Sequence, residues 1–164
     1  MLQQTTVSKG EKRFGWLDGV FHDTSEKKEI ARDIAFLCDD YAAAVRIAAN
    51  LSSHSRWIPY PFLSNRLKKI AEEMRVQAEA LRIKIAELDG QLPQVSVENR
   101  DPMEFRQNVK RLVGDMEEHA SRTETMMHQR NQVKDPNVIR LIDALVLDMQ
   151  RQKEALLDIV MRLS

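Results

Sequence analysis

The chain has 164 residues, of which 30% are charged and 43% hydrophobic, and this length is sufficient for one domain with its own core. Its 25 basic and 25 acidic residues cancel. No global field attracts a polyanion, so we expect binding neither to nucleic acid nor to a membrane. Only five glycines and five prolines interrupt the sequence, which favours few, long helices.

Cysteine content and the first twenty residues indicate the compartment. Cys38 is the only cysteine and lies in an apolar run, so an internal disulfide is excluded and a small buried side chain is expected. The first twenty residues hold no apolar core of a secretory signal. No apolar run reaches the roughly 18 residues of a membrane span. These features predict a cytoplasmic protein.

The first predicted helix begins at Thr24 or Ser25, either of which is a suitable N-cap, and continues to about Ser53 with apolar residues at spacings of three and four. The segment before it is too apolar for a free tail. We expect residues 1–24 to form an N-terminal extension that packs on the bundle or on a partner subunit, with Trp16 and Phe21 as possible interface residues.

The next segment contains Pro59 and Pro61, which no helix interior tolerates, so the chain turns there. Trp57, Tyr60 and Phe62 make it the densest aromatic stretch of the chain. Two interpretations remain open: a loop folded over the end of the domain, or a contact patch for a second subunit or another protein.

The second predicted helix runs from about Phe62 to Leu88 and ends at Asp89-Gly90, where glycine is expected to supply the C-terminal cap. Residues 91–100 are predicted to be an extended crossover. Asp101-Pro102 and Asp135-Pro136 then repeat one helix-start signal. They predict a third helix to about Gln132 and a fourth helix to about Leu163.

Four amphipathic helices of similar length predict an all-α protein, an antiparallel four-helix bundle over residues 25–164. An internal repeat supports two related hairpins. Residues 73–81 and 148–156 both fit the pattern acid-Met-x-x-Gln-x-Glu-Ala-Leu. In this pattern, and in the stretch from Glu72 to Pro93, the chain resembles the ferritin-like superfamily, particularly bacterioferritin and rubrerythrin.

The resemblance implies where the ligands of a di-iron centre would lie. The acid-x-x-His positions fall on Met74 and Gln77 in the second helix and on Met149 and Gln152 in the fourth. The remaining carboxylate positions fall on Asp40 in the first helix and on Met116 in the third. Thioethers and neutral amides are poor ligands for iron, so the resemblance implies a degenerate metal site and no metal cofactor.

Several residues could form more specific sites. If iron or manganese binds, the best candidates are Asp40, Glu118 and His119, which would face the axis after a one-residue change of register. The acid–His pairs at i,i+4, formed by His119 and His128 with Asp115 and Glu124, are typical of surface contacts. A position at the end of a helix explains His54 through the helix dipole. No catalytic residues are predicted.

Three functions follow as hypotheses. The first is a non-catalytic ferritin-like bundle that acts as a binding or structural module, as a homodimer. The second is a metal-binding oxidoreductase or storage protein of the same superfamily with a non-standard site. The third is a bacterial stress-response or regulatory module that binds an apolar ligand in a cavity lined by Met74, Met116 and Met149.

Overall fold

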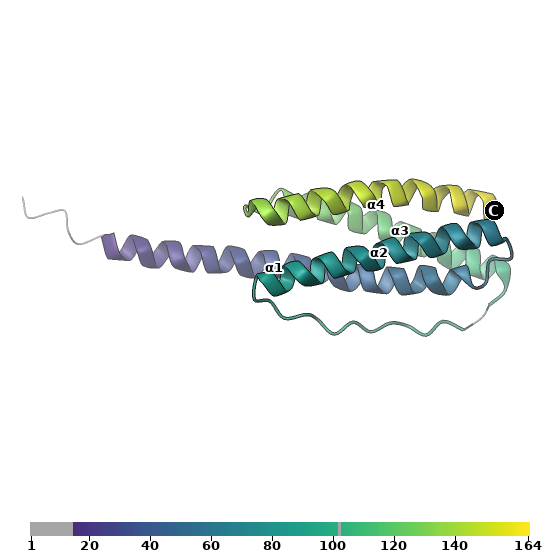
Figure 1. The fold of residues 1–164 in the computed structure, drawn as a ribbon, viewed down its shortest axis with the longest axis horizontal. Helices are drawn as coiled ribbons and strands as arrows, with labels where there is room; N and C mark the ends of the chain where they lie inside the picture. The colour runs from purple at the N-terminus through teal and green to yellow at the C-terminus, as the bar shows by residue number, and fades with distance from the viewer. Residues whose placement is uncertain (1–14, 102) are drawn as a thin grey trace, which may run out of the picture.

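The computed structural model describes the backbone of residues 15–101 and 103–164 and the side chains of residues 24–101 and 103–164. Within these ranges the chain forms four α-helices and no strand, as Figure 1 shows. They are α1 (Gly15–Ser55), α2 (Pro61–Glu87), α3 (Phe105–Arg130) and α4 (Pro136–Leu163). The all-α class with four long helices is confirmed. None of the described helices combines the length and apolar character needed to cross a membrane.

The helices form two hairpins, α1 with α2 and α3 with α4, and the hairpins meet through α1 against α3 and α2 against α4. The long connection after α2 runs along the bundle (Figure 1). Near its start the Cys38 thiol contacts the Gln91 carbonyl oxygen at 3.4 Å, and near its end Arg100 contacts His54. α3 therefore begins at the end of the bundle where α1 finishes.

Side-chain contacts define how α1 lies on α3. In order along α1, Asp40, Arg46, Asn50 and His54 contact residues of α3 that follow in the reverse order, Arg122, Glu118, Asp115 and Asn108. Contacts between α3 and α4 are reversed in the same way, since Arg130 reaches Asp143 and His119 reaches Gln152. Neighbouring helices thus run in opposite directions.

The start of α1 differs from the prediction. The helix is continuous from Gly15, so no break separates residues 15–24 from the rest of α1, and its first turns project beyond the other helices (Figure 1). A helix start needs no residue with a side-chain cap when the preceding residues also favour a helix, and Thr24 and Ser25 were therefore misleading. The side chains of Trp16 and Phe21 lie outside the described residues, and their packing on a partner stays a prediction.

The two helices predicted from an Asp-Pro start signal, α3 and α4, begin in different ways. In α4 the Asp135 side chain accepts a hydrogen bond from the Asn137 backbone N–H at 2.8 Å, as an N-cap should. In α3 the cap position is Glu104, three residues after the predicted cap Asp101, and the helix begins at Phe105. Glu104 makes no side-chain cap bond. Pro102 lies outside the described residues.

The end of α2 uses Asp89 and Gly90 in roles that differ from the prediction. Asp89, not Gly90, has the left-handed backbone, with φ of 58°. The Gly90 N–H donates to the Ile85 carbonyl at 2.9 Å and the Asp89 N–H to that of Ala86 at 3.0 Å, the pair of bonds of a Schellman motif. Glycine is required at 90 for space, since an added Cβ would lie 2.8 Å from Ile34 Cγ2.

The core consists of aliphatic and methionine side chains in two clusters. One lies toward the turn between α1 and α2 and includes Ile47, Leu67 and Leu156. The other lies toward the opposite end and includes Leu37, Ile85 and Ile142. No aromatic side chain of the described residues is fully buried. Buried polar residues lie between and beside the two clusters, and they determine the candidate site.

Gly90 and Gly114 provide a matched test of this packing. We expect Gly90→Ala to lower the free energy of unfolding by about 1–3 kcal/mol, because the β-branched Ile34 and Ile85 cannot easily move. Gly114 has open space around its Cα in α3, so Gly114→Ala should raise stability by about 0.5–1 kcal/mol. Chemical denaturation of both variants measures the difference, and equal effects would contradict this account of the α2 end.

Candidate functional site

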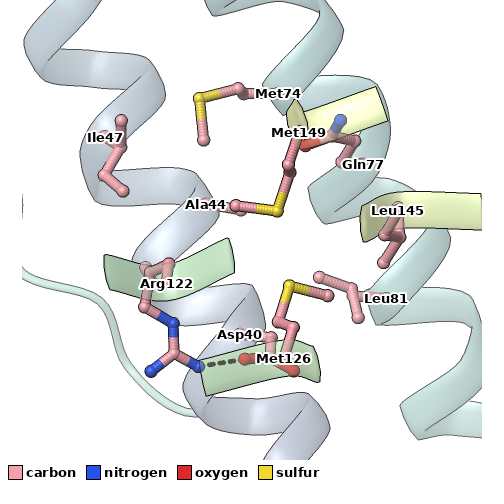
Figure 2. Close-up of a pocket in the computed structure, with 11 residues that line it drawn as sticks. Asp40, Ala44, Ile47, Met74, Gln77, Leu81, Arg122, Met126, Leu145 and Met149 are labelled. Atoms are coloured by element: carbon pink, nitrogen blue, oxygen red, sulfur yellow. Dashed lines mark hydrogen bonds and ion pairs between the residues drawn. The ribbon is translucent and has the colours of Figure 1, made fainter. Parts of the chain in front are cut away.

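The centre of the bundle encloses a small cavity to which all four helices contribute (Figure 2). Its volume is about 10 Å³, close to the minimum for one water molecule. The residues that line it are mainly alanine, leucine, isoleucine and methionine, and the polar ones are Asp40, Gln77 and Arg122. An organic ligand would require the helices to move apart, so the space does not favour the apolar-ligand hypothesis.

The four repeat positions lie inside the bundle. Met74, Gln77, Met149 and Gln152 are exposed by only 1%, 6%, 5% and 1%, which confirms their inward orientation. Met74, Gln77 and Met149 line the cavity, and Met126 adds a third thioether from α3 (Figure 2). The Gln77 amide nitrogen has no partner among the described residues. These positions offer soft sulfur and neutral amide groups to the interior.

Asp40 is the carboxylate that reaches this cavity from α1. It is 3% exposed and pairs with the Arg122 guanidinium, as Figure 2 shows. With its amide turned so that the nitrogen faces Asp40, Gln129 also donates to the carboxylate, at 2.7 and 3.2 Å. Burial raises the pKa of Asp40 to about 6, although Arg122 and Gln129 act in the opposite direction.

His119 lies in a separate polar contact on the side of α4. Its side chain is fully buried, and its Nε2 is 3.1 Å from the Gln152 amide oxygen. The Gln152 amide nitrogen donates to Glu73 of α2 at 3.3 Å. Burial lowers the pKa of His119, against the opposing effect of Gln152, so the neutral imidazole is favoured. It donates from Nε2 and keeps an unpartnered Nδ1.

The three predicted metal ligands do not share a common set of contacts. Glu118 forms an ion pair with Arg46 at the bundle surface, while Asp40 pairs with Arg122 and His119 with Gln152. Each carboxylate therefore already has a cation as its partner. Among the described residues, no group of three or more histidine, cysteine, aspartate or glutamate side chains is arranged to hold a metal ion.

A second polar network, which the sequence did not predict, joins α1, α3 and the connection. His54 Nε2 lies 2.5 Å from Asp115 Oδ2, and His54 Nδ1 lies 2.6 Å from Asn108 Oδ1. Arg100 donates to both Asp115 oxygens at 2.8 and 3.2 Å, and Asn50 donates to Oδ1 at 3.1 Å. Asp115 therefore accepts four hydrogen bonds, two from Asn50 and His54 of α1 and two from Arg100 of the connection.

The contacts of Asp115 determine its ionisation. Burial opposes the charge of its carboxylate, but the hydrogen bonds from His54 and Arg100 outweigh this effect and lower its pKa. The network thus holds the ionised form. It was missed because each of its members has an ordinary explanation when taken alone. A usable signal existed: Asn50 and His54 at i,i+4, and Asn108 and Asp115 at i,i+7, occupy the inner stripes of two helices.

Two predictions about α3 are wrong because its inner face is polar. Asp115 and His119 are 4% and 0% exposed, and they bind His54 and Gln152, so they do not form a surface pair. Met116, the predicted ligand position, is only half-buried and packs beside the first core cluster. The predicted register puts the apolar Met116 on the inner face of α3, but the buried residue is its neighbour toward the N-terminus, Asp115.

The remaining candidates lie at the surface or near it. Trp57, Tyr60 and Phe62 are exposed by 38%, 53% and 67%, and only Ile58 of this turn is buried. The turn therefore does not fold its aromatic side chains over the core. Cys38 is half-buried rather than fully buried, and its thiol contacts the connection. Burial raises the pKa of this thiol.

Comparison with known proteins gives a fold but no family. No protein-family model matches the chain, and no curated protein sequence does. Among solved structures, the chain is similar to the crystal structure of the protein XCC3681 from Xanthomonas campestris pv. campestris, with a TM-score of 0.65 and 16% sequence identity. The match covers 82% of this chain and 92% of that chain, so a similar fold occurs in another protein.

Asp40 should make the bundle less stable as the pH rises. Its pKa in the folded state, about 6, exceeds the ordinary value of 3.8, so the folded chain binds the extra proton between these values. Its contribution is present below about pH 4 and is lost as the pH rises through 6, by about 3 kcal/mol at most. Asp40→Asn removes this dependence. The stability of the wild type minus that of Asp40→Asn should therefore fall between pH 4 and 7.

Asp115 should behave in the opposite way, because its pKa is lowered. Its contribution is present above pH 3.8 and is lost as the pH falls through the folded-state value. Urea denaturation of Asp115→Asn from pH 3 to 7 measures this, with Asp40→Asn as the comparison. A difference that shrinks toward low pH for Asp115 and grows for Asp40 is expected, and slopes of the same sign would refute the assignment.

Proposed function

We propose that this chain is an antiparallel, ferritin-like four-helix bundle that acts as a non-catalytic binding or structural module. The observation that carries the proposal is the neutralised interior. Asp40, the carboxylate that enters the central cavity, pairs with Arg122, and the repeat positions around it are methionine and glutamine. The small cavity, of about 10 Å³, is consistent with a packed centre rather than a binding chamber.

The chemistry of these side chains supports the same conclusion. Two hard metal ions need several carboxylate and imidazole ligands to balance their charge. Here the Arg122 guanidinium pairs with Asp40 and already supplies the positive charge that a metal ion would bring. The long connection that returns α3 to the starting end of α2, and the XCC3681 likeness, support the fold side of the proposal.

Homodimer formation and a cytoplasmic location belong to the same proposal. α1 begins at Gly15, and its first fully buried residue among those described is Asp33. A projecting helix of this length gains little stability without a partner, and the same segment of a second copy would supply one. Sedimentation equilibrium of the chain and of a variant that begins at residue 24 tests this point, with dimer loss expected for the shorter chain.

Elemental analysis tests the metal side of the proposal directly. We expect protein purified without chelators, then incubated with Fe(II) or Mn(II) and desalted, to retain well below one metal per chain. The alternative, a metal-binding protein with a non-standard site, expects stoichiometric metal that is lost in Asp40→Asn or His119→Gln. Retention of that kind would overturn the proposal.

A gain-of-function variant tests the kinship itself. Met74→Glu, Gln77→His, Met149→Glu and Gln152→His together restore the acid-x-x-His pattern inside the bundle. We expect this variant to acquire iron or manganese and a higher melting temperature with metal than without it. The matched control places the same residues at exposed positions, Val76→Glu, Glu79→His, Gln150→Glu and Lys153→His. Equal metal binding by both variants, with circular dichroism showing both folded, would remove the ferritin-like assignment.

A further inference from the structure

Four of the six aromatic side chains of the described residues gather at one end of the bundle. Six aromatic residues have described side chains, and Phe36 and Tyr41 are half-buried. The other four, Trp57, Tyr60, Phe62 and Phe105, are exposed by 38–67%. They belong to the turn between α1 and α2, the first turn of α2 and the start of α3, all at the end of the bundle where the chain finishes (Figure 1). We call these four side chains the aromatic tip.

Exposure of this kind is not required by the fold. Large aromatic side chains normally contribute to the core, but here no described aromatic side chain is fully buried. Ile58, between Trp57 and Pro59, packs under the tip with Leu63 and Leu163 and fixes the turn. Pro59 and Pro61 restrict the backbone on both sides of Tyr60. The backbone of the tip is therefore fixed. Little conformational entropy is lost in holding its exposed rings at the surface.

The charge near the tip is positive although the whole chain is neutral. Within about two helical turns of the tip, six exposed cations take part in no ion pair among the described residues, Arg56, Lys68, Lys69, Arg106, Lys110 and Arg111. Among the described residues of the same region, the only acidic side chains without an ion pair are Asp101 and Glu104. The net charge of zero for the whole chain does not reveal this local excess of positive charge. Positive charge that surrounds exposed aromatic rings is what an anionic surface attracts.

The shape of the tip distinguishes between the partners that could bind to it. A peptide or a small anion needs a groove, and the recess beside Trp57, next to Arg100 and Arg111, leaves no space for a water molecule. A second copy that met this one tip to tip would bring the two sets of cations together. A fluid lipid surface needs no groove, because its headgroups move around protruding side chains, and tryptophan and tyrosine favour that interface.

We propose that the aromatic tip binds the surface of an anionic lipid bilayer. Tyr60 and Phe62, the most exposed of the four rings, enter the headgroup region, and the surrounding lysines and arginines contact the lipid phosphates. α1 and α4 end at the tip, so the bundle stands on the surface and does not cross it. This inference concerns a surface distant from the central cavity and does not depend on the proposed function.

Vesicle co-sedimentation of the full chain tests the proposal, with vesicles of phosphatidylcholine alone or mixed with phosphatidylglycerol. We expect binding to the mixed vesicles that weakens with added salt, and little binding to phosphatidylcholine. Tyr60→Ser with Phe62→Ser should weaken binding about tenfold, and Lys110→Glu with Arg111→Glu by about tenfold or more. In a Trp16→Phe background, the emission of Trp57 should shift to shorter wavelength on binding.

Matched controls use residues of equal kind away from the tip. Val76→Ser with Leu147→Ser removes two apolar side chains that are 64% and 69% exposed, and Arg140→Glu with Lys153→Glu reverses two exposed cations. Both control variants should bind as the wild type does. Failure of the wild type to bind mixed vesicles at low salt, or equal losses in tip and control variants, would overturn the proposal. Self-association that requires Tyr60 and Phe62, without vesicle binding, would assign the tip to a second copy instead.

Discussion

Charged and polar side chains form a row of contacts between α1 and α3, and the rest of the structure depends on how they are neutralised. Two buried carboxylates, Asp40 and Asp115, lie along this interface, and each has an arginine partner, Arg122 or Arg100. A buried carboxylate without a partner would cost several kcal/mol. The Asp40–Arg122 pair and the hydrogen bonds of Asp115 with Asn50 and His54 cross from α1 to α3. They therefore specify which residues of α3 can lie beside α1, because a shift of one position would break them.

The two carboxylates differ in a way that has structural consequences. Asp115 has enough donors to keep its charge, and one of them, Arg100, belongs to the connection. Its network thus attaches the crossover to the end of α1 and helps to define where α3 begins. Asp40 has fewer donors and lies against methionine side chains around the cavity, so burial dominates its pKa. The Asp115 network therefore holds the connection against α1 at neutral pH, whereas Asp40, with a pKa of about 6, changes its ionisation close to neutral pH.

The distribution of residue types separates the inside of the bundle from its end. The interior combines flexible methionines and leucines with a few polar contacts, which can fill a narrow four-helix core without aromatic rings. Four of the six aromatic rings of the described residues lie instead at the end opposite the projecting start of α1. A neutral chain with a positive, aromatic end has two distinct regions, a centre that stabilises the fold and an end that is available for binding.

The spacing of hydrophobic residues and the helix breakers were sufficient to predict the four helices and the cap at Asp135. They were also sufficient to predict the inward orientation of Met74, Gln77, Met149 and Gln152. All these features depend on local geometry and on one face of one helix. The polar face of α3 could not be predicted in this way. Asn108, Asp115 and His119 are buried only because His54, Arg100 and Gln152 meet them from other segments. The tertiary structure alone decided that register, since the burial of a polar residue depends on its partner and not on its neighbours in the chain.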